Sequence, residues 1–234
     1  MANFNGTRAV LFDLDGTLYR QAPLRALMAL ELATLPFYGP LKARQRAIAL
    51  RAYRAAQERL RAPERRHAPE LQIDVAAAAS GLPVAEVRAL VDEWMMVRPL
   101  KYLQFCRAKG LTRLLDLLQQ RGLPAGVLSD YPADAKLRAL GLDGRFAPVL
   151  CASDPEIGAF KPSPRGYLRA CAAWGLRPDQ VLFVGDRADV DAAGAAAAGM
   201  PCVIVGRRRS DAATNGRYEV VPSLERLCDV IHAC

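Results

Sequence analysis

The second half of the chain alternates short apolar runs with segments in which apolar residues recur every three or four positions. Four of the apolar runs have the length of buried strands. They are residues 125–128, 149–152, 181–184 and 202–205. Strands that alternate with helical segments in this way predict a parallel sheet covered by helices on both faces, which is a doubly wound α/β domain.

The helical segments are placed by their apolar stripes and by their ends. The stripes predict helices at residues 111–118, 133–140 and 191–198. Ser163 as a cap, followed by Pro164 at the first helical position, predicts the start of another helix. We expect this last helix to bury one face against the sheet. The residues of that face are Tyr167, Leu168, Cys171 and Trp174.

A further apolar run, residues 9–12, ends in two carboxylates. Side chains alternate between the two faces of a strand, so Asp13 and Asp15 point to the same side, and Gly16 lets the chain turn away. An aspartate beside a bound cation can attack phosphorus, and a second carboxyl nearby can exchange a proton with the leaving oxygen. Taken alone, the pair fits equally well an ordinary strand end with solvated acids.

Polar residues follow three of the apolar runs directly. They are Asp13, Ser129 and Asp186. In open α/β sheets, ligands bind at the carboxyl ends of the strands, where the connections diverge to opposite faces. We therefore expect the three side chains to converge on one site. A dinucleotide-binding domain has the same architecture, but no Gly-x-Gly-x-x-Gly joins a strand to a helix in this chain.

Four segments, in this order, resemble the motifs of the haloacid dehalogenase superfamily. They are FDLDGTLY at 12–19, VLSDYP at 127–132, EIGAFKPSP at 156–164 and VLFVGDRADVDAAGAAAAGM at 181–200. The resemblance extends over residues 8–19 and 98–210. It implies a Rossmann-like α/β core with a phosphatase type of site.

The stretch between the first strand and residue 125 is longer than one crossover helix requires. Residues 20–97 read as helical and alanine-rich. Breaks in this segment are expected near residues 36–40, 63–69 and 81–83. The resemblance implies that residues 20–97 form an inserted helical cap that closes over the substrate and excludes water, with residues 1–19 and 98–234 as the catalytic core.

The resemblance also implies roles for the carboxylates. Asp13 is the expected nucleophile, which would carry an aspartyl-phosphate. Asp15 is the expected acid and base, and this role requires a pKa above the usual value of about 3.9 in at least one state of the cycle. Mg²⁺ prefers hard oxygen ligands, so Asp13, Asp186 and the backbone carbonyl of Asp15 form the expected metal site. The absence of histidine and thiolate from this set argues against zinc.

Four other motif residues have expected supporting roles. Ser129 would donate its hydroxyl to a phosphoryl oxygen, although an ordinary turn serine is the alternative. Lys161 stands in an apolar, proline-rich stretch, so a buried position would require an acidic or phosphate partner, whereas an exposed loop lysine would not. Asp191 is expected to orient Lys161 or a metal-bound water. Asp189 is the doubtful member, because acids at a helix start often only favour the helix dipole.

The chain carries 32 basic and 24 acidic side chains, a net charge of +8, and the basic excess is concentrated in the predicted cap. One cap helix is expected to bury an apolar stripe of Leu50, Tyr53, Ala56 and Leu60. The opposite face would carry Arg44, Arg51, Arg54 and Arg59. We favour a solvated face over a nucleic-acid surface, because nucleic-acid modules usually interleave aromatic and basic residues.

Composition and cysteine usage limit the class of protein further. With 52% hydrophobic residues among 234, the chain can build a sizeable core. No segment approaches the roughly 20 apolar residues that cross a bilayer, and nothing near the start reads as a signal peptide, so we expect a cytoplasmic protein without a membrane partner. The six cysteines form no Cys-x-x-Cys pair and read as small buried hydrophobes.

These features together predict a Mg²⁺-dependent phosphatase that hydrolyses a small phosphorylated metabolite through an aspartyl-phosphate. Asp15 disfavours a dehalogenase, because displacement of a halide needs no acid for its leaving group. A phosphomutase would use the same two acids and stays an alternative. A polyanion-binding or nucleic-acid-binding protein that uses the basic cap is the weaker alternative. The sequence leaves the physiological substrate and the oligomeric state open.

Overall fold

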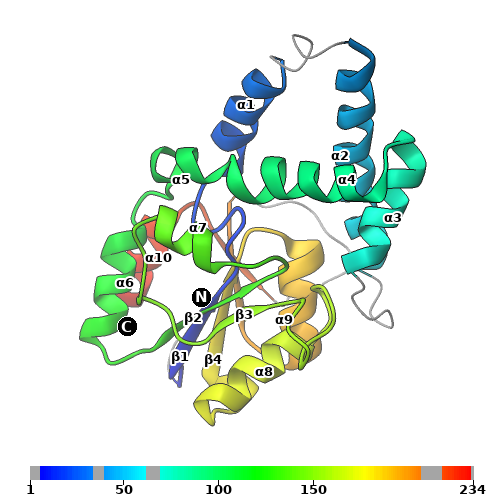
Figure 1. Ribbon diagram of the computed structural model, residues 1–234. Coiled ribbons are helices and arrows are strands. Elements are labelled where there is room, and N and C mark those ends of the chain that lie inside the picture. Colours follow the sequence, from blue (N-terminus) through cyan, green and yellow to red (C-terminus); the bar gives the residue numbers. More distant parts are fainter. Residues whose placement is uncertain (1–5, 34–39, 62–68, 207–217, 233–234) are drawn as a thin grey trace.

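The computed structural model describes residues 6–33, 40–61, 69–206 and 218–232. Its centre is a six-stranded parallel sheet with the order β3-β2-β1-β4-β5-β6 (Figure 1). The strands are β1 (Ala9–Phe12), β2 (Ala125–Ser129), β3 (Val149–Cys151), β4 (Val181–Gly185), β5 (Cys202–Val205) and β6 (Glu219–Val221). The predicted doubly wound α/β class is therefore confirmed.

Helices cover both faces of the sheet (Figure 1). One face packs against α6 (Leu111–Gln120), α7 (Asp134–Ala139) and α10 (Leu224–His232). The other face packs against α8 (Arg165–Trp174) and α9 (Ala193–Ala198). Strand β1 shows the alternation that makes this possible, because Val10 and Phe12 join the first cluster while Ala9 and Leu11 join the second.

A second group of helices lies between β1 and β2 in the sequence and above the sheet in Figure 1. It consists of α1 (Gln21–Leu32), α2 (Pro40–Leu60), α3 (Pro69–Ser80), α4 (Val84–Val91) and the π-helix η2 (Asp92–Val97). We call these elements the helical insert. Helix α5 (Leu100–Cys106) follows it and packs against both α1 and α7. The domain boundary at residue 97 stays a prediction, because the chain continues through this boundary into a helix that contacts both sides.

The insert follows the predicted pattern where the structure describes it. The stripe on α2 is buried, and it consists of Leu50, Tyr53, Ala56 and Leu60. The expected break at residues 81–83 is present between α3 and α4. The other two expected breaks, at residues 36–40 and 63–69, lie almost entirely outside the described residues.

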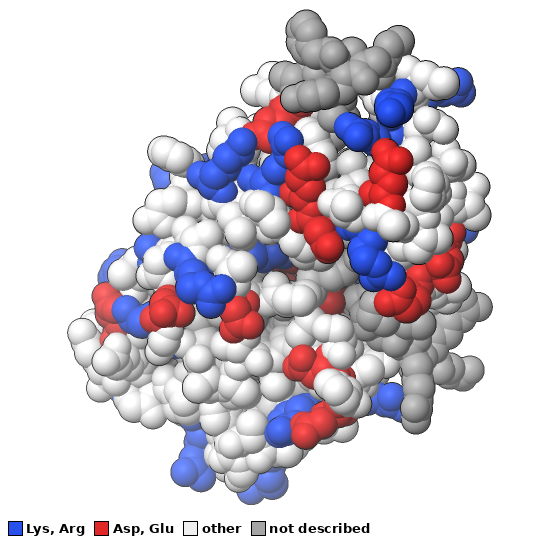
Figure 2. Space-filling view, in the orientation of Figure 1, with Lys and Arg blue, Asp and Glu red and all other residues white. Residues whose placement is uncertain are grey.

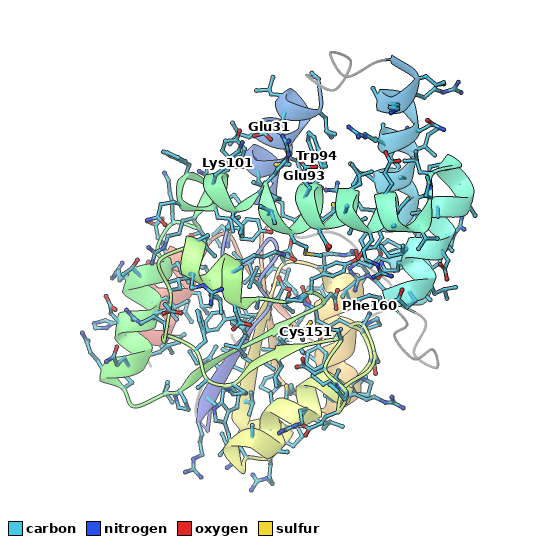
Figure 3. All side chains as sticks on the ribbon, viewed as in Figure 1. Glu31, Glu93, Trp94, Lys101, Cys151 and Phe160 are labelled. Atoms are coloured by element: carbon cyan, nitrogen blue, oxygen red, sulfur yellow. The ribbon has the colours of Figure 1, made fainter. Side chains whose placement is uncertain are left out.

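An ionic cluster joins the start and the end of the insert (Figure 3). Glu31 of α1 pairs with Lys101, and its other oxygen lies 3.1 Å from a guanidinium nitrogen of Arg98. The Arg98 guanidinium in turn sits 4.3 Å above the Trp94 ring. Partial burial alone would raise the pKa of Glu31, but hydrogen bonds from Lys101 and its neighbours lower the pKa to about 2. The cluster therefore fixes α1 against η2 and α5.

Two local predictions were wrong. The helix expected to begin with Ser163 as a cap begins at Arg165, with Pro164 as the capping residue and no side-chain cap bond. Ser163 is buried instead. Leu168 was expected on the buried face but is 44% exposed, because α8 packs on the sheet through Tyr167 and smaller residues such as Cys171.

The described cysteines behave as small buried hydrophobes. They are Cys106, Cys151, Cys171, Cys202 and Cys228. Cys234 lies outside the described residues. Across the described part of the chain, no helix has the length and apolar character that a membrane crossing requires.

Candidate active site

Three aspartates meet at the carboxyl ends of the central strands. Asp13 follows β1, and its backbone N–H donates to the Val184 carbonyl of β4 at 2.8 Å. Asp186 follows β4, and Asp191 lies in the short π-helix η4 (Ala188–Ala192). One carboxylate oxygen from each aspartate lies within 4.8 Å of the others. We call Asp13, Asp186 and Asp191 the carboxylate cluster.

Lys161 inserts its ammonium into this cluster. Its Nζ lies 2.5 Å from Asp13 Oδ1 and 2.8 Å from Asp191 Oδ1, and the residue is only 5% exposed. The two carboxylates raise the pKa of Lys161 against the opposing effect of burial, so the ammonium stays charged. The prediction that a buried Lys161 needs acidic partners is confirmed, and the alternative of an exposed loop lysine is excluded.

Asp191 positions the lysine and the loop after β4. One of its oxygens accepts from Lys161, while Oδ2 accepts backbone N–H groups of Asp186 at 3.1 Å and Arg187 at 3.0 Å. Gly185 makes this approach feasible, because a Cβ at that position would lie 2.5 Å from the Asp191 side chain. Asp191 thus orients Lys161, as the sequence led us to expect.

Asp15 lines the same cavity as this cluster and has partners of its own. Lys136 Nζ contacts both of its oxygens, at 2.6 and 2.8 Å, and the Tyr19 hydroxyl donates to Oδ1 at 2.5 Å. Burial raises the pKa of Asp15, but the Lys136 charge and these hydrogen bonds outweigh burial and lower it. In the state described here the carboxyl is ionised, so the raised pKa expected for an acid does not occur in this state.

Ser129 ends β2, and its hydrogen bond to a phosphoryl oxygen stays a prediction. The residue is buried, and its hydroxyl oxygen accepts the Tyr131 N–H at 3.3 Å. The next residue, Asp130, has stronger connections. Its carboxylate accepts the Lys161 backbone N–H at 3.1 Å and a guanidinium N–H of Arg61 at 2.6 Å. Asp130 therefore ties the loop after β2 to the loop that carries Lys161.

Asp189 does not join the cluster. It is exposed and pairs with Arg187 at 2.5 Å. Arg187 also reaches Glu58 of α2 at 2.9 Å, so this pair belongs to the contact between the core and the insert. Asp189 was the doubtful member of the predicted site, and its position outside the carboxylate cluster agrees with that doubt.

A cavity of about 470 Å³ opens between the core and the insert. Its core side includes Asp13, Asp15, Lys161 and Asp186. Its insert side combines apolar side chains, Leu24, Met28, Trp94 and Met95, with polar and charged ones, Arg25, Arg54, Gln57, Glu58 and Arg61. Arg54 is exposed, as we expected, and it also lines this open cavity, because the side of α2 that bears Gln57, Glu58 and Arg61 faces the core.

The charges of the cluster fit a divalent cation. Burial and the nearby Asp13 raise the pKa of Asp186 to about 8, and burial raises the pKa of Asp13 to about 6 despite Lys161. Three carboxylates thus share one ammonium, and an added cation would offset the remaining repulsion. Gly16, with φ of +118°, allows this crowding, because a Cβ there would collide with the Asp186 carboxylate. The ligand set is oxygen only, which suits a hard cation.

The three expected metal ligands differ in how far their oxygens are already occupied. Asp186 has no side-chain hydrogen bond to another described residue, whereas Asp13 uses Oδ1 for Lys161 and Oδ2 for the Thr17 hydroxyl. The Asp15 carbonyl accepts from the Gln21 side chain and retains a second lone pair. Asp191 has both oxygens engaged by the protein, so it serves the site as a support.

Sequence reasoning missed three charged residues of the site. Lys136 carried a usable signal, because it shares one helical stripe with Ala133 and Leu140, and a lysine on a buried stripe needs a partner. Asp130 stands beside a residue that was singled out. Arg61 has one local partner, Glu58, but its two contacts with the core gave no signal, because those partners lie 69 and 100 residues away in the sequence.

Comparisons with known proteins agree with this geometry. Residues 7–199 match the family described as haloacid dehalogenase-like hydrolase. The phosphoglycolate phosphatase of Shigella boydii is 31% identical over 227 residues, covering 87% of this chain and 82% of that protein. The N-acetylmuramic acid 6-phosphate phosphatase of Pseudomonas aeruginosa is 29% identical over 192 residues, covering 76% and 73% of the two chains.

Solved structures show the same fold. A 2-haloacid dehalogenase from Pseudomonas syringae superposes with a TM-score of 0.66 at 24% identity and covers 97% of this chain and 99% of its own. A HAD phosphatase from Thermococcus onnurineus gives a TM-score of 0.65 at 22% identity, covering 96% and 98% of the two chains. With the family match over most of its length and the relatives above, this chain belongs to the haloacid dehalogenase-like hydrolases.

Proposed function

We propose that this chain is a Mg²⁺-dependent phosphatase that hydrolyses a small phosphate monoester through an aspartyl-phosphate on Asp13. One observation carries the proposal: Asp13, held by the buried Lys161, and a second carboxylate, Asp15, held by Lys136, line the core side of the same cavity. The relatives support it, because their names are those of phosphatases. Both names specify a phosphate ester of an organic acid.

In the first step, an oxygen of Asp13 attacks phosphorus as the bond from phosphorus to the ester oxygen breaks. Lys161 and the Thr17 hydroxyl hold the Asp13 carboxylate in one orientation, which favours in-line attack. The leaving oxygen takes a proton from Asp15 and departs as an alcohol. The Lys161 ammonium stabilises the negative charge on the transferring group.

In the second step, Asp15 takes a proton from water as the water oxygen attacks the phosphorus of the aspartyl-phosphate. Inorganic phosphate leaves and the Asp13 carboxylate is restored. Asp15 is ionised in the structure, so it must gain its proton with the substrate. A bound phosphate dianion raises the pKa of a neighbouring carboxyl and competes with it for Lys136.

Asp13, Asp186 and the Asp15 carbonyl would hold the cation on the core side of the cavity. Bound there, Mg²⁺ would neutralise charge on the phosphoryl oxygens and on the carboxylate cluster. The weaker alternative, a polyanion-binding surface, finds little support. Figure 2 shows acidic and basic side chains interspersed over the insert on the face in view.

The test is release of inorganic phosphate from p-nitrophenyl phosphate and ethyl phosphate, with Mg²⁺ and after its removal by a chelator. We expect release only with Mg²⁺, and Asp13→Asn should lower it by about 1000-fold or more, because an amide is a poor nucleophile. Asp189→Asn is the matched control, since that exposed aspartate lies outside the cluster. Unchanged release by Asp13→Asn would refute the mechanism. Phosphoryl transfer to a second substrate molecule without free phosphate would identify a phosphomutase.

A further inference from the structure

Two arginines of the insert face the cavity without a carboxylate partner among the described residues. Arg25 lies on α1 and Arg54 on α2, and both line the cavity that holds Asp13. Arg25 donates to the Gln21 side-chain oxygen, and Arg54 donates to the Met95 sulfur at 3.4 Å. Other arginines at this interface are paired differently. Arg61, Arg98 and Arg187 each contact a carboxylate.

The two guanidinium groups lie close enough to repel each other. Burial lowers the pKa of Arg54, and the charge of Arg25 lowers it further. Both residues line the cavity and are exposed to solvent, so this repulsion is screened but is not offset by an acidic partner among the described residues. An anion placed between them would relieve this repulsion, and guanidinium forks match carboxylate and phosphate oxygens in geometry.

Arg25 and Arg54 each lie close, along the helix, to a residue that contacts the core. Gln21, which donates to the Asp15 carbonyl, lies one helical turn before Arg25. Glu58, which pairs with the core residue Arg187, lies one turn after Arg54. Each arginine is therefore four residues, about 6 Å, further along its helix than a residue in contact with the core. Because both arginines line the same cavity as Asp13 and Lys161, one bound molecule can contact both groups.

The cavity wall beside the arginines is apolar. Met28 and Trp94 are buried, and Met95 lies at the contact with Arg54. Such a wall suits a short carbon skeleton. The acid that the insert contributes to the cavity, Glu58, pairs with Arg61 and Arg187 and makes no ion pair with Arg25 or Arg54 among the described residues.

We propose that Arg25 and Arg54 form a subsite for a second anionic group of the substrate, so that the preferred substrates are short phosphate monoesters that also carry a carboxylate or a second phosphate. This inference rests on the proposed function. Lys161 and the cation site bind the phosphoryl group on the core side, and the two arginines bind the second anion on the insert side.

The test compares kcat/KM for three esters of similar length: 2-phosphoglycolate, ethyl phosphate and ethylene glycol bisphosphate. The first replaces a methyl group of the second by a carboxylate, and the third carries a second phosphate. We expect one or both anionic esters to exceed ethyl phosphate by about 10- to 100-fold, the range for hydrogen bonds between charged groups. The anionic ester with the larger kcat/KM shows whether the second anion is a carboxylate or a phosphate.

Variants test whether Arg25 and Arg54 cause the higher kcat/KM for the anionic esters. Arg25→Gln and Arg54→Gln should each bring the ratio of anionic to neutral ester most of the way to one, mainly through KM, while Arg54→Lys should retain part of it. Arg51→Gln is the matched control, because Arg51 lies on the same helix, is exposed and does not line the cavity. Circular dichroism of each variant checks folding, and Arg54→Lys keeps the test valid if Arg54→Gln unfolds.

The outcomes separate this inference from the proposed function. Hydrolysis of all three esters with equal kcat/KM would overturn the subsite and leave the phosphatase standing. An advantage that survives both glutamine variants, or that Arg51→Gln abolishes equally, would also overturn it. If the protein hydrolysed none of the three esters and did not hydrolyse p-nitrophenyl phosphate, the proposed function itself would be refuted.

Discussion

The two sides of the cavity differ in how their charges are satisfied. On the core side, Lys161 and Lys136 each contact a carboxylate at 2.5 to 2.8 Å, so the reacting groups are already held in position without a ligand. On the insert side, Arg25 and Arg54 face the cavity beside apolar side chains and have no such partner among the described residues. The difference supports the two proposals, in which the core carries out the reaction and the insert selects the substrate.

The largest effect should come from the core. We expect Asp15→Asn to lower turnover of ethyl phosphate by about 100- to 10,000-fold, the usual contribution of a general acid. The loss should be smaller with p-nitrophenyl phosphate, because that leaving group needs no proton. Steady-state rates on the two esters measure the difference. Equal losses would show that Asp15 acts only through its contacts with Lys136 and Tyr19.

A second core test separates the lysine from the metal site. Lys161→Met should lower kcat/KM by about 100- to 1000-fold, because a preorganised charge on the transferring group is lost. The Mg²⁺ concentration that gives half-maximal activity should not rise, because loss of the ammonium leaves the carboxylate cluster more negative. Asp186→Ala should raise that concentration instead. Magnesium titrations of both variants provide the measurement, and an identical shift in the two would mean that the roles are misassigned.

A third test uses pH and stability. The pKa values of Asp186, about 8, and Asp13, about 6, lie above the usual 3.8. Between pH 3.8 and these raised pKa values, the two carboxyls keep their protons in the folded state but lose them in the unfolded state. The stability that these protons contribute is therefore lost as pH rises from about 4 to 8. Mg²⁺ replaces these protons, so its stabilising effect on Tm should be larger near pH 8 than near pH 5. A Tm increase that does not depend on pH would contradict the metal assignment.

The smallest effect should come from the outer face of the insert. Arg44, Arg51 and Arg59 are exposed and do not line the cavity. Changing all three to glutamine should alter the free energy of unfolding by no more than about 0.5 kcal/mol per site, with kcat/KM for a small ester nearly unchanged. Chemical denaturation and steady-state kinetics measure both. A large, salt-sensitive loss of affinity for nucleic acid would revive the polyanion alternative.

The same contrast explains how much the sequence could predict. Asp13 and Asp186 could be placed together because parallel strands present their carboxyl ends at one edge of the sheet. Lys161 could be recognised because a lysine among apolar residues requires partners. Arg54 is exposed as expected, but its place in the cavity lining was missed, since helical periodicity identifies the buried stripe of α2 and not the flank that faces the core. Arg61 depends wholly on how α2 packs over two distant loops.

Arg61 has a consequence for the balance between open and closed forms. Its guanidinium contacts both the Asp130 carboxylate and the Lys161 carbonyl, at 2.6 and 2.8 Å. If the insert moved away, Asp130 would lose its cationic partner while it still bound the Lys161 backbone, and a carboxylate left in this way is costly. If the insert opens and closes as the resemblance implies, these contacts would favour the closed form without ligand. Binding would then require a minor open population, and the apparent affinity would fall in proportion to the fraction of open molecules.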